Sequence, residues 1–139
     1  MKILILCTGN SCRSQMAEGF VKSFDHNQEV YSAGTKPEKE VNPKAVTVMK
    51  EKEINLDQNV PKNVDQFLDQ PFDYVITVCD SAKETCPVFM GDVKHRLHMG
   101  FEDPAGATGT EEEILEKFRK VRDQIETEFF KFYKTKLKN

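Results

Sequence analysis

Near its beginning the chain reads Ile3-Leu4-Ile5-Leu6-Cys7-Thr8-Gly9-Asn10-Ser11-Cys12-Arg13-Ser14. The apolar run predicts a strand and the residues after Ser14 predict a helix, so the thiol of Cys7 stands at a strand end. Free N–H groups of the loop and of the first helical turn favour binding of a tetrahedral oxyanion. Arg13 adds a planar fork that matches two anion oxygens, and the same positive field favours the thiolate of Cys7. The stretch therefore predicts an anion loop with sulfur as the nucleophile.

Composition narrows the class of protein. The chain has 139 residues, of which 38% are hydrophobic and 31% charged, which predicts one globular domain over residues 1–139. A net charge of −3 gives no indication of a nucleic-acid partner. No apolar run approaches the ~18 residues of a membrane span, and no signal-peptide pattern is found. We therefore expect a cytoplasmic protein with neither a nucleic-acid nor a membrane partner.

Hydrophobic periodicity predicts strands that alternate with helices. The expected strands are 2–6, 29–32, 72–78 and 94–98, and the expected helices are 14–24, 42–53 and 110–136, with a short helix or turn at 64–68. Thr110 and Glu113 form a capping-box pattern at the start of the last helix. The alternation predicts an α/β three-layer sandwich, with a four-stranded parallel sheet and helices on both faces. Because ligands bind beyond the carboxyl ends of parallel strands, Cys7 and Cys79 are expected on the same rim of the sheet.

Four cysteines occur, at positions 7, 12, 79 and 86. In a reducing compartment such a set indicates redox catalysis or metal binding rather than structural disulfides. The separation of Cys79 from Cys86 does not match the usual zinc-ligand spacings. His95 and His98 lie on the weakest predicted strand, and we expect surface or core histidines there rather than a catalytic base.

Further motifs follow the anion loop in a fixed order: Tyr31-Ser32-Ala33-Gly34, Asn42-Pro43-Lys44-Ala45, Cys79-Asp80 with Cys86-Pro87, and Gly100-Phe101-Glu102-Asp103-Pro104-Ala105. Over most of its length the chain resembles the thioredoxin-coupled arsenate reductases, which share the fold of the low-molecular-weight protein tyrosine phosphatases. The loop motif alone does not separate reductase from phosphatase, whereas the Cys79/Cys86 pair favours the reductases. One departure is Met99, where the resembled reductases often carry tryptophan.

The resemblance implies roles for residues of the anion loop and for Asp103. Cys7 is the expected nucleophile toward arsenate, and phosphate and sulfate are expected competing oxyanions. Asp103 is the expected proton donor to the departing hydroxide. Ser14 is expected to hydrogen-bond the Cys7 thiolate, and Cys12 to be a bystander thiol. The expected substrate-binding residues are Thr8, Gly9, Asn10, Ser11, Cys12, Arg13 and Ser14.

The resemblance also implies a thiol relay. Cys79 would attack the Cys7 sulfur and release arsenite, and Cys86 would then attack Cys79 and leave a Cys79–Cys86 disulfide. Disulfide exchange requires the attacking thiolate to reach the target sulfur, so the segment 79–90 is expected to move. A thioredoxin-like dithiol would restore the pair, and the chain is expected to act as a monomer.

No cofactor is required by this scheme, although some resembled proteins bind potassium beside the anion loop. Asn10, Glu18 and Ser32 match that site by position. The segment Val60-Pro61-Lys62 does not match it, so the Lys62 ammonium is a candidate replacement for the ion.

Two alternatives remain open at the level of sequence. A phosphatase of the same fold, acting on phosphate monoesters, would need Cys7, Arg13 and Asp103 but not the cysteine pair. A non-catalytic oxyanion-binding redox sensor would need no proton donor, so the role of Asp103 separates it from the enzymes.

Overall fold

The computed structural model describes residues 1–138 and contains a four-stranded parallel sheet in the order β2-β1-β3-β4. The strands are β1 (Lys2–Cys7), β2 (Glu29–Gly34), β3 (Phe72–Thr77) and β4 (Val93–His98). The helices are α1 (Arg13–Phe24), α2 (Pro43–Lys50) and α3 (Glu111–Phe132). Shorter turns are the 3-10 helices η1 (Val64–Phe67) and η2 (Pro104–Gly106) and the π-helix η3 (Tyr133–Leu137). The predicted parallel sheet is confirmed.

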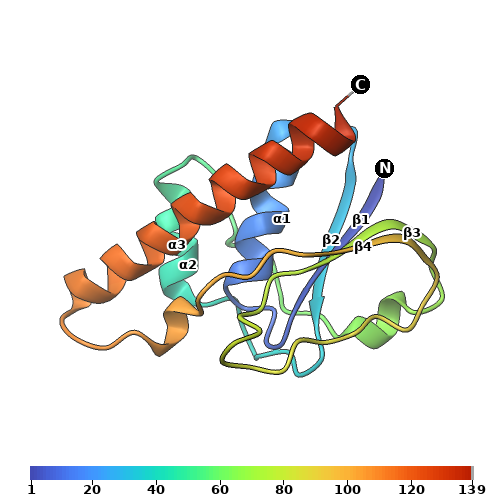
Figure 1. The fold of residues 1–139 in the computed structure, drawn as a ribbon. Helices are drawn as coiled ribbons and strands as arrows, with labels where there is room; N and C mark the ends of the chain where they lie inside the picture. The colour runs from blue at the N-terminus through green and yellow to red at the C-terminus, as the bar shows by residue number, and fades with distance from the viewer. Residues whose placement is uncertain (139) are drawn as a thin grey trace.

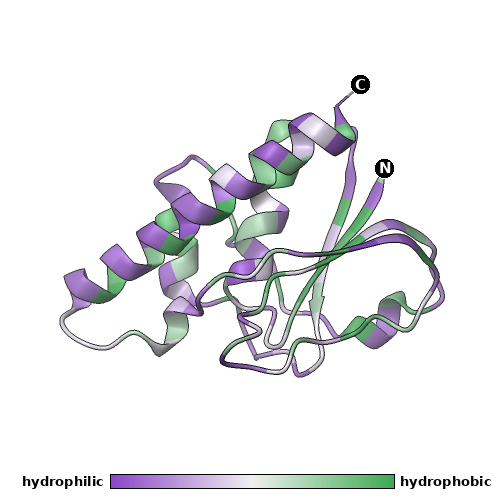
Figure 2. Ribbon diagram, viewed as in Figure 1, coloured by the Kyte–Doolittle hydropathy of each residue, from purple (hydrophilic) through white to green (hydrophobic). Residues whose placement is uncertain are grey.

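Helices cover both faces of the sheet, but unequally (Figure 1). The three α-helices pack over one face, where alternate residues of β1 such as Ile3 and Ile5 join one apolar core. The opposite face presents Leu4 and Leu6, which are covered by η1 and by Phe89. Because both faces of β1 are buried from Ile3 onward, its side chains are apolar from Ile3 to Leu6, and Figure 2 shows hydrophobic residues along the central strands.

Local sequence explains where the helices begin and end. The Asn42 side chain accepts a hydrogen bond from the Lys44 N–H and caps α2, and the capping box at the start of α3 is present as predicted. The expected end of α2 near residue 53 was too late, because the helix stops at Lys50. Glu53 has a φ of 62°, a left-handed conformation that an α-helix cannot contain.

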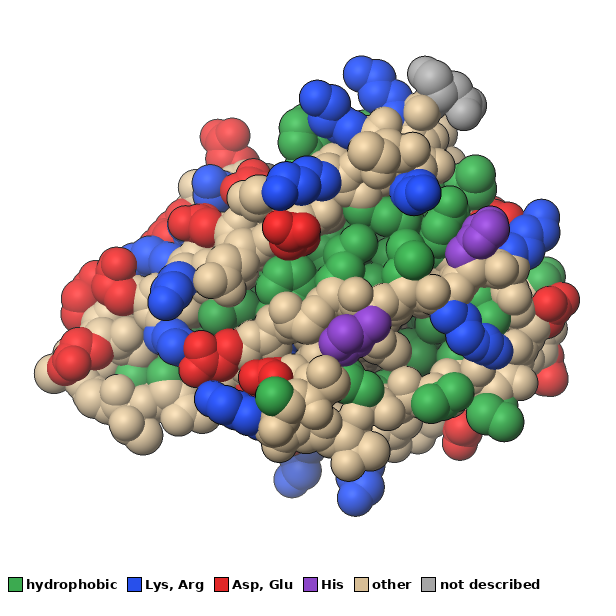
Figure 3. Space-filling view, in the orientation of Figure 1, with side chains coloured by type: hydrophobic (Ala, Val, Ile, Leu, Met, Phe, Trp, Pro, Cys, Tyr) green, Lys and Arg blue, Asp and Glu red, His purple; other side chains and the backbone are tan. Residues whose placement is uncertain are grey.

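The inner stripe of α3 forms much of the core. Phe118, Val121, Ile125 and Phe129 are buried as their helical spacing predicts. On the face shown in Figure 3, hydrophobic side chains lie between α3 and the sheet. The partly buried Leu97, on the edge strand β4, packs against this core. The packing fixes α3 to the sheet and leaves the carboxyl ends of the strands open for the site.

In residues 1–138 no helix is both long and apolar enough to span a bilayer.

Candidate active site

The predicted anion loop links the end of β1 to the start of α1. Three of its carbonyls face outward, since those of Thr8, Gly9 and Ser11 accept hydrogen bonds from the backbone N–H groups of residues 36, 38 and 42. In a trans peptide the following N–H points the opposite way, so the N–H groups of the loop face inward. The Asn10 N–H does so, at 3.3 Å from the Cys7 Sγ. The loop is thus built to receive an anion at the sulfur.

Gly34 allows this loop to approach β2. A Cβ at that position would lie 2.3 Å from the Thr8 carbonyl oxygen, a distance at which the backbone must shift. The Gly34 N–H also donates to the Lys62 carbonyl. The absence of a side chain at Gly34 therefore lets the anion loop pack directly against the end of β2.

Cys7 is buried, and its sulfur has two donors. The Ser14 Oγ lies 3.0 Å from the Cys7 Sγ, and it accepts a hydrogen bond from the Asn10 Nδ2 at 2.7 Å. Because the Ser14 oxygen accepts this hydrogen bond from the Asn10 amide, the Ser14 hydroxyl proton can point at the sulfur. The Ser14 hydroxyl and the Asn10 N–H therefore both approach the Cys7 sulfur as hydrogen-bond donors. The predicted contact between Ser14 and Cys7 is present.

Asn10 fixes the loop in an uncommon conformation. Its φ of 52° is left-handed, which asparagine tolerates better than most residues. Its Oδ1 accepts from the Lys62 N–H at 2.9 Å and from the Gln15 Nε2 at 3.1 Å, and Gln15 also donates to the Asn10 carbonyl. These bonds hold the loop in shape before any anion arrives.

Arg13 is buried, and its guanidinium is hydrogen-bonded to a carboxylate. Its two terminal nitrogens donate to the two Glu84 carboxylate oxygens at 3.2 and 2.9 Å, and one of them also donates to the Phe101 carbonyl at 3.0 Å. Burial opposes the charge on Arg13, but the Glu84 hydrogen bonds and the charges of Asp103 and Cys7 outweigh it and raise the pKa of the guanidinium. Glu84 therefore takes the place on Arg13 that an oxyanion would take.

Asp103 lies at the mouth of the site. Its Oδ2 is 3.6 Å from an Arg13 terminal nitrogen, and its side chain is 45% exposed. Its Oδ1 accepts from the Ala105 N–H, which holds the carboxyl at the start of η2. Asp103 and Cys7 line the same cavity of about 380 Å³, together with the whole anion loop. The structure thus brings the expected nucleophile and the expected proton donor to one cavity.

Cys12, the second free cysteine, is also buried. Burial raises the pKa of the Cys12 thiol to about 12, partly offset by a contact with the Ser11 hydroxyl. At neutral pH such a thiol is protonated and a poor nucleophile. Its backbone carbonyl accepts the first hydrogen bond of α1 from the Met16 N–H. The role of Cys12 as a bystander thiol stays a prediction.

The remaining two cysteines are joined. A disulfide links Cys79 to Cys86, with 5.7 Å between their Cα atoms, while Cys7 and Cys12 are free. Leu6 pairs with Thr77 in the sheet, so Cys7, the last residue of β1, and Cys79, two residues after β3, lie at the same rim, as predicted. The structure is therefore that of an oxidised form, with the disulfide beside the anion loop.

The expected cation region is built around Glu18. The Ser32 Oγ donates to the Glu18 Oε1 at 2.7 Å, and the Lys22 Nζ lies 2.8 Å from the Oε2. The Lys62 Nζ is more distant, at 4.0 Å from the Oε1. Burial lowers the pKa of Lys62, partly offset by the charge of Glu18. The carboxylate is thus neutralised mainly by Lys22, with Lys62 as a second and weaker partner.

Three residues of this site were not singled out from the sequence. Lys22 stands four residues after Glu18 on α1, a spacing that alone predicts an ion pair. Gln15 follows the loop directly, but nothing in its neighbourhood indicates its contacts with Asn10. Glu84 is separated from Arg13 by 71 residues, and no local sequence pattern predicts their contact.

This geometry can be compared with known proteins. Residues 2–139 match the family described as low molecular weight phosphotyrosine protein phosphatase. The chain belongs to this family. Its curated relatives include a protein named arsenate reductase from Halalkalibacterium halodurans, which is 48% identical over 88% of each chain. Another protein of that name, from Bacillus subtilis, is 44% identical over 96% of this chain and 95% of its own.

A solved structure of this low-molecular-weight phosphatase family shows the same fold. It is described as an arsenate reductase in the phosphate binding state, with a TM-score of 0.78 and 30% identity over 95% of this chain and 96% of that one. The predicted membership and fold are confirmed by these similarities. Family membership does not by itself choose between phosphate-ester hydrolysis and arsenate reduction, so the choice depends on the chain's own thiols.

Proposed function

We propose that this chain reduces arsenate to arsenite by a relay among Cys7, Cys79 and Cys86. The observation that carries the proposal is the Cys79–Cys86 disulfide on the same sheet rim as the anion loop. Hydrolysis of a phosphate ester uses a nucleophile, an arginine and an acid, but no second or third thiol. The names of the curated relatives support the same activity.

In the first step the Cys7 thiolate attacks arsenic(V) and a sulfur–arsenic bond forms. One arsenic–oxygen bond breaks, and the departing hydroxide takes a proton from Asp103 and leaves as water. Arg13 and the inward N–H groups of the loop bind the remaining oxygens and stabilise their charge. For this step Glu84 must leave Arg13, because both groups cannot occupy the guanidinium fork together.

In the second step the Cys79 thiolate attacks the Cys7 sulfur. A Cys7–Cys79 disulfide forms, the sulfur–arsenic bond breaks, and its electron pair stays on arsenic, which leaves as arsenite. Neighbouring strands in a sheet lie ~4.8 Å apart, so adjacent strand ends place the two cysteines within reach of a modest loop movement. The Cys86 thiolate then attacks Cys79, which frees Cys7 as a thiolate and gives the disulfide seen in this structure.

The final step needs an external dithiol that becomes a disulfide, and we propose a thioredoxin-like protein. Cys86 is half-buried, and the nearby Val88 and Met90 are 71% and 82% exposed. Exposed apolar side chains beside a reducible bond suit a protein partner. Such a reductant is found in reducing compartments, so we also propose a cytoplasmic location. All residues of the relay come from one chain, in keeping with a monomer.

We further propose that no potassium ion is required at Glu18, because Lys22 and Lys62 supply the positive charge. Replacing potassium by sodium in the buffer should leave the melting temperature and turnover unchanged. In a double Lys22→Ala, Lys62→Ala variant, potassium should raise the melting temperature. A potassium-specific stabilisation of the unmodified protein would contradict this proposal.

The decisive experiment is arsenate-dependent NADPH consumption in the presence of thioredoxin and thioredoxin reductase. We expect turnover with the unmodified protein and none with Cys7→Ser. Hydrolysis of p-nitrophenyl phosphate is measured in parallel on the same preparations. Rapid ester hydrolysis that survives Cys79→Ser, with no arsenate-dependent NADPH consumption, would instead identify a phosphatase. Tight arsenate binding without either activity would identify an oxyanion-binding sensor.

A further inference from the structure

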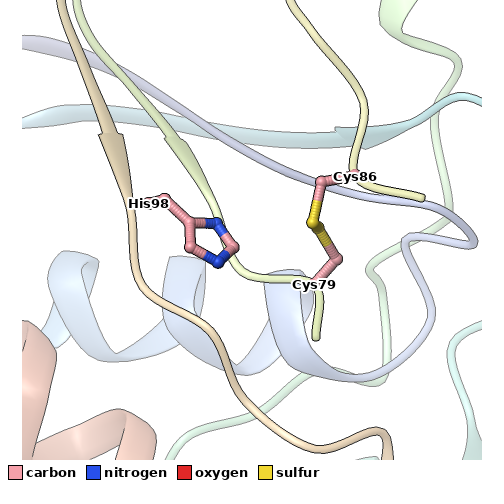
Figure 4. Close-up of side chains that lie close together, drawn as sticks. All are labelled: Cys79, Cys86 and His98. Carbon is pink, nitrogen blue, oxygen red and sulfur yellow. A yellow bond between two sulfur atoms is a disulfide. The ribbon is translucent and has the colours of Figure 1, made fainter. Parts of the chain in front are cut away.

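A third side chain lies against the cysteine pair. Donor atoms of Cys79, Cys86 and His98 all lie within 4.8 Å of one another, and Figure 4 shows the imidazole beside the two sulfurs. Cys79 follows β3, His98 ends β4, and Cys86 comes from the segment between these strands. His98 has no role in the relay described above. The spacing of residues in the sequence did not predict that it would lie beside the cysteines.

The orientation of His98 is fixed by a neighbour. Its Nδ1 lies 2.7 Å from the Thr77 Oγ1, so the tautomer that donates from Nδ1 leaves the lone pair of Nε2 free. The Nε2 lies above Gly100, where a Cβ would be 3.2 Å from it and 3.4 Å from the Cys79 carbonyl oxygen. An imidazole held by a hydrogen bond at one nitrogen and open at the other is the usual arrangement of a metal ligand.

The chemistry of the three donors selects the metal. Two thiolates and one imidazole are typical ligands of zinc, with Zn–S near 2.3 Å and Zn–N near 2.0 Å. A tetrahedral ion with those bonds needs donors about 3.6–3.8 Å apart. The two sulfurs, which are bonded to each other in this oxidised form, must separate to that spacing on reduction, and a ring nitrogen of His98 already lies within 4.8 Å of both. No carboxylate belongs to the group, which disfavours magnesium or calcium.

We propose that the reduced form of this protein binds one zinc ion through the Cys79 and Cys86 thiolates and the His98 Nε2. A dithiol or phosphine reductant first cleaves the disulfide and is itself oxidised, the two thiols release two protons on binding, and a water fills the fourth position. The oxidised form has no thiolates to offer, so zinc and the disulfide exclude each other. His98 is exposed and Cys86 half-buried, which leaves the ion a path from solvent.

The site has a consequence for activity that rests on the proposed function. Zinc would hold both resolving cysteines as bound thiolates and so prevent the attack of Cys79 on Cys7. We therefore expect zinc to inhibit arsenate reduction, and a chelator to restore it.

The test uses the full chain reduced with a phosphine and freed of oxygen. Zinc is titrated against a chromophoric chelator, and cobalt(II) is added separately to observe sulfur-to-metal charge transfer and the d–d bands of a tetrahedral site. We expect one equivalent bound in the reduced form and none in the oxidised form. His98→Gln should weaken zinc binding at least ~10-fold, and Thr77→Val, which removes only the hydroxyl that orients the ring, ~10-fold.

Matched variants locate the site. His95→Gln changes the other histidine of β4, which stacks on Tyr74, and it should leave zinc affinity unchanged. Cys7→Ser cannot run the relay but should bind zinc normally, which separates this proposal from the proposed function. Unaltered zinc affinity in His98→Gln, loss of binding in Cys7→Ser, or no stoichiometric binding by the reduced chain would each overturn the proposal.

Discussion

Glu84 is hydrogen-bonded to the arginine to which we assign oxyanion binding, and neutralising Glu84 should therefore increase the affinity of the oxidised protein for oxyanions. Both carboxylate oxygens of Glu84 are bonded to the Arg13 fork. The residue sits inside the loop that the Cys79–Cys86 disulfide closes. Within that loop the Lys83 and Glu84 N–H groups donate to the Asp80 carbonyl, so Glu84 is presented on an ordered turn. An incoming sulfate must displace it.

The magnitude follows from the contact. A hydrogen bond to a charged group contributes about 1.5–3 kcal/mol, but the Glu84 side chain is 25% exposed and water screens part of the attraction. We take about 1.4 kcal/mol as the net free energy by which the Glu84–Arg13 contact is favoured. Arg13 is then free of Glu84 about one tenth of the time. The apparent Kd of an oxyanion is raised in the same proportion. Glu84→Gln should therefore bind sulfate about tenfold more tightly in the oxidised form.

Sulfate is the suitable probe because the relay cannot reduce it by this route, and isothermal titration calorimetry gives its Kd directly. Glu102→Gln is the matched control, since Glu102 is a nearby carboxylate that pairs with Lys117 rather than Arg13, and it should leave the Kd unchanged. An unchanged or weaker sulfate affinity in Glu84→Gln would refute the idea that Glu84 competes for the arginine.

Three further changes test other parts of the structure. Cys86→Ser should complete one turnover with arsenate and stop at a Cys7–Cys79 disulfide, visible by peptide mass mapping; sustained thioredoxin-driven turnover would exclude the three-thiol relay. Cys12→Ser should keep activity, and in the unmodified reduced protein at pH 7 Cys12 should resist iodoacetamide, because burial raises its pKa to about 12; its rapid alkylation in the folded protein would contradict the assigned environment. The hydrogen bond from the Lys2 N–H holds the pKa of Asp73 below its usual value. The Asp73 carboxylate therefore stabilises the folded protein above the unfolded pKa of ~3.9, and this contribution is lost as the pH falls through the lower folded pKa. Asp73→Asn should cost about 1 kcal/mol in urea unfolding at pH 7 and progressively less toward pH 2, and a cost that does not shrink with acid would refute this linkage.

Local sequence was sufficient for the framework of the fold. The buried run of β1, the capping box of α3 and the alternation of strands and helices predicted the parallel sheet. They did so because periodicity and capping depend on residues close together in the chain. The anion loop was predictable for the same reason, since Cys7, Asn10, Arg13 and Ser14 lie within eight consecutive positions. The rim shared by Cys7 and Cys79 followed from the topology of parallel strands.

Tertiary structure decided the contacts that join distant segments. Glu84 reaches Arg13 across 71 residues, and the Thr77 hydroxyl orients His98 across 21. The spacing of the cysteines had argued against a zinc site, and the third ligand enters only because β4 pairs with β3. The three α-helices also share one face of the sheet, which strand–helix alternation does not specify. These features depend on how loops close and where side chains point after the sheet assembles, and no local periodicity encodes either.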